Sequence, residues 1–344
     1  MISKSVYIDQ LKQGMNFSDN WVIVDSRLAQ SKNGPYWDLK LQDKTGVLDA
    51  KIWPPLSSEY TDLQPEQFAA VQGEVRSFRD RLQLVVQKLE PLDTLEEDVN
   101  WADFLPVSSR DPEEMLWELE NLCREELKYS PWKKLCKKVL QDSDIRGKLL
   151  RAPAAKALHH AYIGGLLEHT LSVGKICLSL SSLYPDMDRE ILLVAALFHD
   201  LGKAWELEGR ISRKYSDQGQ LLGHIMLTLE ILEPFIQKIK DLDQDLVLHL
   251  KHMILSHHGE YEFGSPKRPK TPEAMILHFA DNMDAKLNTM ADVMESMEQE
   301  GASWSAFQPS LQRYLYRPVH TASFHPKKEE NKGVAKQCSL PLKE

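Results

Sequence analysis

The protein has 344 residues, 42% of them hydrophobic and 27% charged, and a formal net charge of -9. This is the composition of an ordinary soluble globular protein, and the length predicts more than one domain. The longest apolar stretch, Ile191 to Phe198, is too short to span a bilayer, and Met1 to Gln10 has no signal-peptide core, so we expect no membrane partner and a cytoplasmic location.

The cysteine spacing and the charge distribution limit which metal sites and partners the sequence allows. The four cysteines have no CxxC spacing, which argues against a disulfide framework and against a thiolate zinc site. Any metal would therefore be held by His and carboxylate side chains. The negative net charge does not exclude a nucleic-acid partner, because acidic residues concentrate between Asp93 and Glu126 and basic surfaces remain elsewhere.

Residues 12–92 are predicted to form an all-β domain. Asn33-Gly34-Pro35 and Asp43 to Gly46 are turn signals between segments of alternating apolar residues. Five strands suit a small closed barrel of the OB type. The expected strands are Trp21–Val24, Tyr36–Leu41, Val47–Trp53, Phe68–Arg76 and Leu82–Leu89.

The remainder is predicted to be helical. Residues 93–150 read as an acidic linker and helical connector, residues 151–300 as a helical domain, and residues 317–344 as a disordered tail. Asp111-Pro112 and Thr271-Pro272 have the residue types that begin helices. Apolar residues recur at helical spacing in Met115–Leu127, Trp132–Leu140, Leu166–Leu180, Glu190–Leu201, Gly223–Ile239, Leu246–Ser256 and Pro272–Met290.

An ordered series of histidines and aspartates indicates a metal site. His199 and Asp200 end the apolar run together, and two buried polar groups at a helix end need partners that a cation would supply. Because a carboxylate has two oxygens, Asp200 could bridge two ions, and such sites hydrolyse phosphoesters. Imidazole and carboxylate ligands without thiolate suit Mn, Fe, Co or Ni better than structural Zn, and ligand type does not choose among these four. Mn is the ion that we expect first. The candidate ligands are His169, His199, Asp200, His224, His257, His258 and Asp281.

Residues 159–290 resemble an HD-domain phosphohydrolase, whose ligands are a His, an adjacent His-Asp pair and a later Asp. The resemblance implies His169, His199, Asp200 and Asp281 as these ligands. The other three histidines match the pattern of members that hold two metals. The same resemblance places Lys203 beside the phosphate, as a catalytic residue with Asp200.

Three segments are more specific: HHAYIGGLLEHT from His159, SHHGEYEFGSP from Ser256 and LHFADNMDAK from Leu277. With an N-terminal OB domain, they resemble the YhaM family of 3'-5' exoribonucleases. That resemblance implies metal-dependent hydrolysis of single-stranded RNA from the 3' end, with single-stranded DNA as a second candidate and a homo-oligomer left open. His160 is a candidate proton donor or phosphate contact, with a structural role as the alternative.

Two other functions are also compatible with these sequence motifs. One is an HD-type hydrolase of small or cyclic nucleotides with a regulatory OB domain, although the Gly-Tyr-Pro signature of the cyclic dinucleotide enzymes is missing after His258. The other is a non-enzymatic nucleic-acid-binding factor. For an RNA strand, we expect aromatic and basic residues to provide stacking and phosphate contacts. The candidates are Tyr36, Trp37, Lys40, Lys51, Trp53, Arg76, Phe78, Arg79, Arg81, Lys267, Arg268 and Lys270.

Overall fold

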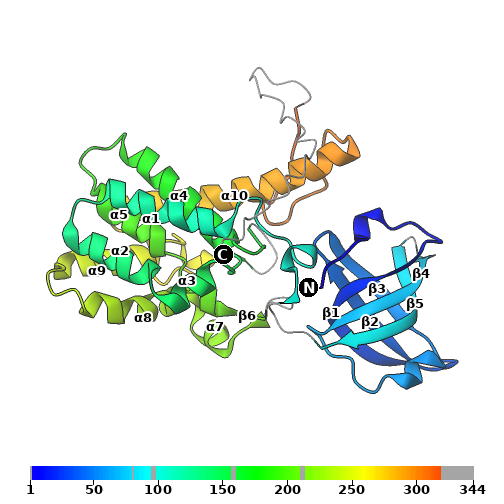
Figure 1. Cartoon of the computed structure of the whole chain (residues 1–344). Coiled ribbons are helices and arrows are strands. Elements are labelled where there is room, and N and C mark those ends of the chain that lie inside the picture. Colours follow the sequence, from blue (N-terminus) through cyan, green and yellow to red (C-terminus); the bar gives the residue numbers. More distant parts are fainter. Residues whose placement is uncertain (1, 80, 94–97, 156–159, 210–213, 319–344) are drawn as a thin grey trace, which may run out of the picture. The chain divides into compact units, whose positions relative to one another are not determined.

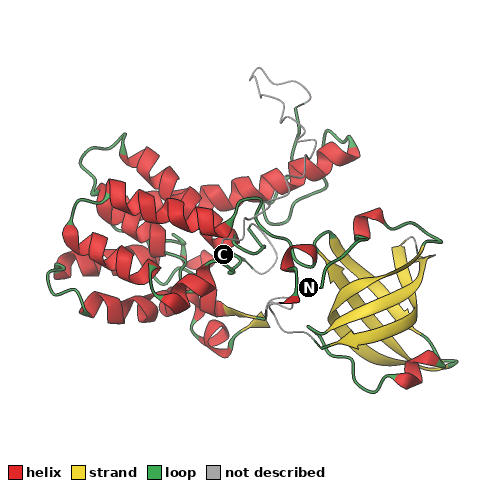
Figure 2. Cartoon of the chain, in the orientation of Figure 1, coloured by secondary structure: helices red, strands yellow, loops and turns green. Residues whose placement is uncertain are grey.

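The computed structural model describes residues 2–79, 81–93, 98–155, 160–209 and 214–318 (Figure 1). Strands gather in the N-terminal part of the chain and helices in the rest (Figure 2). The tail expected after residue 317 lies almost entirely outside the described residues. Within the described ranges, no helix has both the length and the apolar character that a bilayer span requires.

Five strands form a closed barrel in the order β1-β2-β3-β5-β4, which confirms the predicted OB-type architecture. Neighbouring strands are antiparallel, except that β3 and β5 are parallel. The strands are β1 (Asn16–Ser31), β2 (Gly34–Asp43), β3 (Gly46–Ile52), β4 (Phe68–Phe78) and β5 (Arg81–Leu92).

Strand β1 is much longer than the predicted Trp21–Val24. Its first half pairs with β4 and its second half with β2, and the register shifts between Ile23 and Asp25. Such a bulge bends a strand from one neighbour to the next. The apolar pattern predicted only the central part of β1, because the residues at both ends of the strand are mostly polar. A second constraint lies at Gly73 in β4, where a Cβ atom would stand 2.5 Å from the carbonyl oxygen of Val85.

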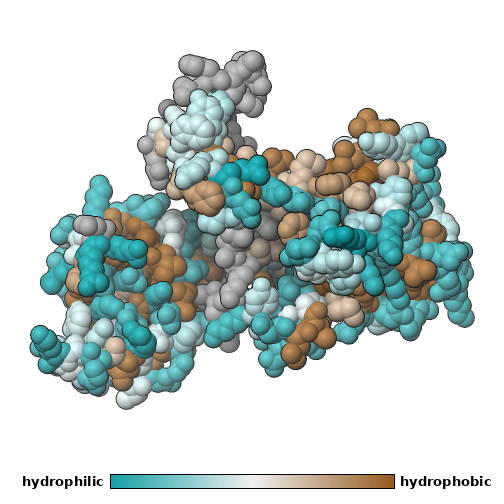
Figure 3. Space-filling view, turned by 180° about the vertical axis from the view of Figure 1, so that it is seen from behind, coloured by the Kyte–Doolittle hydropathy of each residue, from teal (hydrophilic) through white to brown (hydrophobic). Residues whose placement is uncertain are grey.

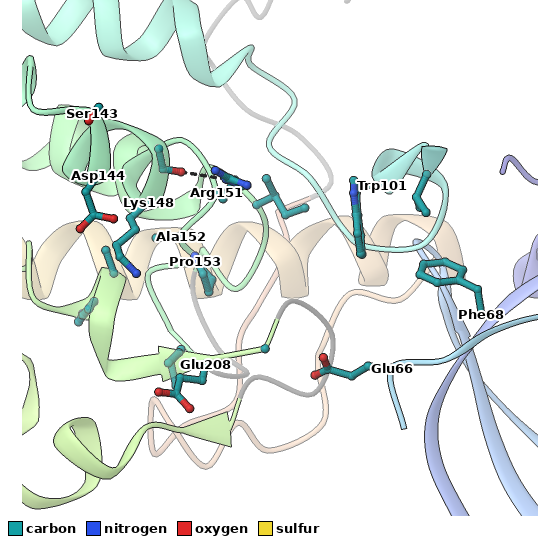
Figure 4. Close-up of a pocket in the computed structure, with 17 residues that line it drawn as sticks. Glu66, Phe68, Trp101, Ser143, Asp144, Lys148, Arg151, Ala152, Pro153 and Glu208 are labelled. Carbon is teal, nitrogen blue, oxygen red and sulfur yellow. Dashed lines mark hydrogen bonds between the residues drawn. The ribbon is translucent and has the colours of Figure 1, made fainter. Parts of the chain in front are cut away.

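Part of the segment after the barrel, predicted as a linker, packs against the barrel. Trp101 begins a short 3-10 helix, Trp101–Asp103, and its ring packs edge to face on Phe68 of β4 at 5.6 Å (Figure 4). Phe104 and Leu105 are fully buried with Val22 of β1. These apolar side chains lie within an acidic stretch, and they bind the start of the connector to the barrel wall.

The helical part contains the long helices that the apolar periodicity predicted, together with short ones that it did not. Helices α3, α6 and α7 have seven residues or fewer, which is too few for a periodic pattern. The helices are α1 (Pro112–Glu126), α2 (Ser130–Leu140), α3 (Ser143–Leu149), α4 (Gly165–Ser181), α5 (Arg189–Phe198), α6 (Lys203–Glu206), α7 (Asp217–Leu221), α8 (Gly223–Gln237), α9 (Gln244–Ser256) and α10 (Pro272–Glu300). Strands β6 (Leu207–Glu208) and β7 (Lys214–Tyr215) form a small hairpin.

Helix α5 lies at the centre of the helical core. Every residue from Ile191 to Phe198 is buried, and α5 contacts α2, α4 and α9. Asp188 caps its start by accepting hydrogen bonds from the backbone N–H groups of Glu190 and Ile191, which satisfies donors that the helix leaves unpaired. A fully packed helix of this kind holds whatever follows its C-terminus in a fixed place.

The surface is mixed in character. On the face shown in Figure 3, hydrophilic residues surround separate hydrophobic patches. The large apolar side chains with high exposure include Trp53 and Phe78 in the barrel domain and Tyr261 and Phe263 in the helical part. Single exposed apolar residues are ordinary in soluble proteins, so an exposed residue indicates a binding site only when its neighbours support that role.

Lys4 is a buried charge in the barrel. Its side chain has no exposed surface, and its ammonium group lies 3.1 Å from the centre of the Trp21 ring and donates to the carbonyl of Asn20 at 3.0 Å. Desolvation outweighs the nearby carboxylates, chiefly Asp19, and lowers the pKa of Lys4 to about 8. Folding therefore works against the protonated form.

We predict that the stability of the protein, relative to a Lys4→Met variant, rises between about pH 8 and pH 10.5. In this window the unfolded lysine keeps its proton while the folded one loses it, so the unfolded state binds more protons and stability increases with pH. Urea unfolding of both proteins across this range measures the effect. Parallel stability curves would contradict the assignment.

Candidate metal centre

Two helices end in a histidine that caps its own helix. His199 follows α5, and its Nδ1 lies 2.8 Å from the carbonyl oxygen of Ala196. His257 follows α9, and its Nδ1 lies 2.7 Å from the carbonyl oxygen of Ile254. A carbonyl oxygen only accepts, so Nδ1 must carry the proton in both rings, and Nε2 keeps its lone pair. Each fixed ring therefore presents Nε2 as a metal ligand.

The other three predicted histidine ligands are oriented in the same way. Nδ1 of His169, in α4, lies 2.7 Å from Oδ2 of Asp284. Nδ1 of His224, at the start of α8, lies 3.2 Å from Oε1 of Glu206. His258 donates from Nδ1 to a backbone carbonyl at 2.9 Å. In all five rings an acceptor takes Nδ1, which is the arrangement that sets the tautomer of metal-binding histidines.

Asp200 lies between two groups of these rings. Its Oδ1 is 3.5 Å from Nε2 of His224 and 3.4 Å from Nε2 of His257. Its Oδ2 is 3.4 Å from Nε2 of His169 and 3.3 Å from Nε2 of His199. Each carboxylate oxygen thus faces its own pair of imidazoles.

The structure brings all seven predicted ligands together, in two groups that share Asp200. Asp281 of α10 joins one of them, with Oδ1 3.2 Å from Nε2 of His169. Within each group the possible ligand atoms lie within 4.8 Å of one another. The groups are Asp200, His224, His257 and His258, and His169, His199, Asp200 and Asp281.

The buried polar atoms of this cluster fit divalent cations. Among the described residues, Nε2 of His224 and Nε2 of His257 are buried without a hydrogen-bond partner. Nε2 of His169 and Nε2 of His199 lie 3.2 Å apart. When both rings are neutral, the acceptors at the two Nδ1 atoms leave a lone pair on each Nε2. Buried acceptors that face one another are costly. A cation between them would remove this cost, so the residues present suit a metal.

The protonation equilibria agree with this interpretation. Desolvation, reinforced by His257 and His224, lowers the pKa of His258 to about 3, so its ring is neutral and able to bind a metal. Burial opposes protonation of His169, but the carboxylates of Asp200, Asp281 and Asp284 outweigh it and raise its pKa. Without a cation, a proton serves as the positive charge that these carboxylates require.

Lys203 supplies a second positive charge at Asp200. Its Nζ lies 2.7 Å from Oδ2 of Asp200. Burial disfavours the ammonium form, but Asp200 and Asp281 more than compensate and raise the pKa of Lys203. Burial likewise opposes ionisation of Asp200, and Lys203 and His199 reverse this and hold its pKa well below the usual range. Asp200 is therefore an anion whose partners are all in the site.

Comparison with known proteins agrees with the geometry. Residues 166–286 match the HD domain family, and residues 22–92 match an OB-fold nucleic acid binding domain. The chain is 34% identical to the 3'-5' exoribonuclease YhaM of Bacillus subtilis, over 80% of this chain and 87% of that protein. It is 32% identical to the 3'-5' exoribonuclease YhaM of Listeria monocytogenes serotype 4b, over 87% and 94%. The chain belongs to the YhaM family.

His160 lies outside the two ligand groups that share Asp200 in this YhaM-family site, but it forms a third group of possible ligand atoms with His169 and Asp284. Its Nδ1 is 2.9 Å from the hydroxyl of Tyr162, and its Nε2 is 3.0 Å from Oδ2 of Asp284. Both ring nitrogens are engaged and the residue is buried, which agrees with the structural role given as the alternative. The catalytic role of His160 stays a prediction. His159, before it, lies outside the described residues.

Two carboxylates that the sequence did not single out support the ligands. Asp284 accepts from His169 and also faces His160, and Glu206 accepts from the ring and the backbone N–H of His224. Asp284 follows Asp281 by three residues, so helical spacing places both on one side of α10. Glu206 has no comparable signal, because a turn of the chain brings it to His224.

The candidate nucleic-acid residues on the barrel differ in their availability. Tyr36 and Trp53 stack on each other at 4.5 Å across β2 and the end of β3. Trp37 is in the barrel core and donates through Nε1 to the carbonyl of Tyr60. The prediction that Trp37 contacts nucleic acid is therefore wrong, because its ring has no face open to a base.

The basic candidates are mostly on the surface. Lys51 pairs with Asp38, and Arg76 pairs with Glu74 at 2.8 Å, so part of their charge is already compensated. Arg268 pairs with Glu260 at 2.7 Å. The remaining candidates have exposed side chains and stay predictions as nucleic-acid contacts: Lys40, Phe78, Arg79, Arg81, Lys267 and Lys270.

We predict that Asp284→Asn lowers the affinity of this centre for Mn²⁺ by about 10- to 100-fold, because the amide holds the ring of His169 less strongly. Glu206→Gln should produce a loss of similar size through His224. Isothermal titration of metal-depleted protein measures both. Glu295→Gln, an exposed change on α10, is the control, and wild-type affinity in both test variants would contradict the assigned roles.

Proposed function

We propose that this protein is a divalent-metal-dependent 3'-5' exoribonuclease that hydrolyses single-stranded RNA at the centre around Asp200. The observation that carries the proposal is the division of ligands between the two oxygens of that carboxylate. Membership of the YhaM family supplies the substrate class and the direction of cleavage. Single-stranded DNA is a second candidate substrate.

Two ions per chain are the proposed complement, one for each ligand group. Mn²⁺ is the ion that we propose first, with Fe, Co and Ni as alternatives, since imidazole and carboxylate ligands suit all four. Divalent ions held there would polarise a phosphoryl oxygen, promote the ionisation of water and stabilise the leaving oxygen.

The protein's own residues fix the reaction geometry. Asp200, two residues after α5, and Asp281, in α10, supply the negative ligand atoms from two separate elements. Lys203 is partly exposed, with 15% of its side chain accessible, so its ammonium can meet a phosphate while remaining next to Asp200. In that position it would offset the negative charge that develops on the phosphoryl group during hydrolysis.

The barrel is the proposed holder of the strand upstream of the cleavage site. Tyr36 and Trp53 form a stacked aromatic pair on its outer surface, and Lys51 lies 5.5 Å from the centre of the Tyr36 ring. Aromatic faces beside cations bind single strands without regard to sequence, because every base has a face to stack.

We predict that Asp200→Ala abolishes hydrolysis while RNA binding persists, since the barrel is unchanged. Metal-depleted enzyme is incubated with 5'-labelled single-stranded RNA, with and without Mn²⁺, beside this variant and an Asp217→Ala control on the exposed helix α7. A metal-dependent ladder that shortens from the 3' end is the expected result. Cleavage by the variant, or hydrolysis of small nucleotides alone, would contradict the proposal.

We predict that a Tyr36→Ala, Trp53→Ala variant loses at least roughly fivefold in kcat/KM on RNA, because each stacked base is worth about 1–3 kcal/mol. Its hydrolysis of bis(4-nitrophenyl) phosphate should remain at the wild-type rate, since that ester is too small to reach a second domain. Trp117→Ala, at an exposed tryptophan on α1, is the matched control. Equal losses on both substrates would contradict a strand-holding role.

A further inference from the structure

An exposed aromatic turn follows the double histidine directly. Residues Tyr261–Phe263 form a 3-10 helix, and the side chains of Tyr261 and Phe263 are 58% and 61% exposed. Neither ring belongs to a core cluster of the described residues. Two large rings held in solvent within five residues of His258 have no role in packing.

The backbone of this turn is fixed. Phe263 donates its N–H to the carbonyl of Glu260 at 3.1 Å, and Gly264 donates to the carbonyl of Tyr261 at 3.0 Å. Gly264 has φ +82°, a left-handed conformation that glycine adopts without strain. Beyond it Ser265 is buried, with its hydroxyl 2.6 Å from the carbonyl oxygen of Lys267. The exposed rings therefore stand on an ordered base.

Hydrogen bonds connect the turn to His258 of the metal centre. The carbonyl oxygen of Phe263 accepts from Nδ1 of His258 at 2.9 Å, and Nε2 of the same ring faces the ligand group. The backbone N–H of Glu260 also donates to the carbonyl of His258 at 3.0 Å, so side-chain and backbone contacts together fix the turn relative to this ligand. A strand whose last phosphodiester lies at this centre would pass a turn that begins three residues after His258.

The charges around the turn match a polyanion. The guanidinium of Arg268 lies 5.0 Å from the centre of the Tyr261 ring and is held by Glu260 at 2.7 Å. Lys267 and Lys270 are exposed on the same loop. Glu260 and Glu262 are the acidic neighbours, and Glu260 is already paired with Arg268. An aromatic face with a cation over it and further cations beside it is the combination that binds single-stranded nucleic acid.

We propose that Tyr261 and Phe263 form a stacking platform for the bases next to the phosphodiester that is cut, with Arg268 and Lys267 contacting the adjoining phosphates. The occupant is the 3' end of a single RNA strand, so this inference rests on the proposed function. A protein partner fits less well, because two separate rings on a cationic loop offer little contiguous apolar area.

The test combines protein and substrate changes. Tyr261→Ala and Phe263→Ala should each raise KM on single-stranded RNA by roughly 5- to 100-fold, the range that one lost stacking interaction implies. Tyr261→Phe and Phe263→Tyr keep a ring and should keep the wild-type KM. On RNA with abasic sites in its last nucleotides, the wild type should lose affinity, and the alanine changes should add little to that loss.

Controls separate the possible failures. Tyr184→Ala removes an exposed ring between α4 and α5 and should change nothing. Hydrolysis of bis(4-nitrophenyl) phosphate should be unaffected in every variant, because backbone atoms hold His258. An active wild type with unchanged alanine variants, alanine losses that persist in full on abasic RNA, or equal losses on the small ester would each overturn the platform alone. A wild type that does not degrade RNA would overturn the proposed function and the platform together.

Discussion

The burial of the Asp200 carboxylate is the constraint on which the rest of the site depends. Its side chain is 1% exposed, and an unpaired carboxylate in such a place would be prohibitively costly. Its neighbours are imidazoles that have already committed their Nδ1 protons to other acceptors. Lys203 supplies one positive charge beside Asp200 and Asp281, and without a metal a proton on His169 supplies another. Divalent ions bound by the imidazoles and carboxylates would take the place of that proton.

The two histidines that end helices α5 and α9 orient metal ligands through hydrogen bonds that the helix ends need in any case. A helix leaves its last carbonyls without partners, and His199 and His257 each satisfy such a carbonyl three residues earlier. The same bond sets the tautomer and turns Nε2 toward Asp200. Because α5 and α9 are packed in one core, the two rings are placed by helix packing rather than by loops. The same hydrogen bond, from a histidine Nδ1 to a carbonyl three residues earlier, thus stabilises both helix ends and orients both ligands.

Most of the ligand set could be predicted from the sequence because the residue types are specific and ordered. The sequence predicts less well which residues support the ligands and which aromatic residues are buried. Alternation places Tyr36 and Trp37 on opposite faces of β2, but both are aromatic, so the pattern does not say which ring enters the core. Glu206 reaches His224 through a tertiary turn, and His160 is placed behind Asp284 by a backbone with φ +51°. Neither relation is encoded in local spacing.

An acidic protein can bind a polyanion when its positive charge is local. The chain carries a net charge of -9, yet the ligand atoms gather where cations would lie, and the exposed cations of the loop from Lys267 to Lys270 follow His258 closely. Charges farther than about 10 Å are largely screened at moderate salt, so the field that a phosphate meets at the site is set by these neighbours. The net charge of the whole chain therefore does not decide whether RNA binds. Lys203 beside Asp200 and the cations next to the aromatic turn lie where the proposed substrate carries its phosphates.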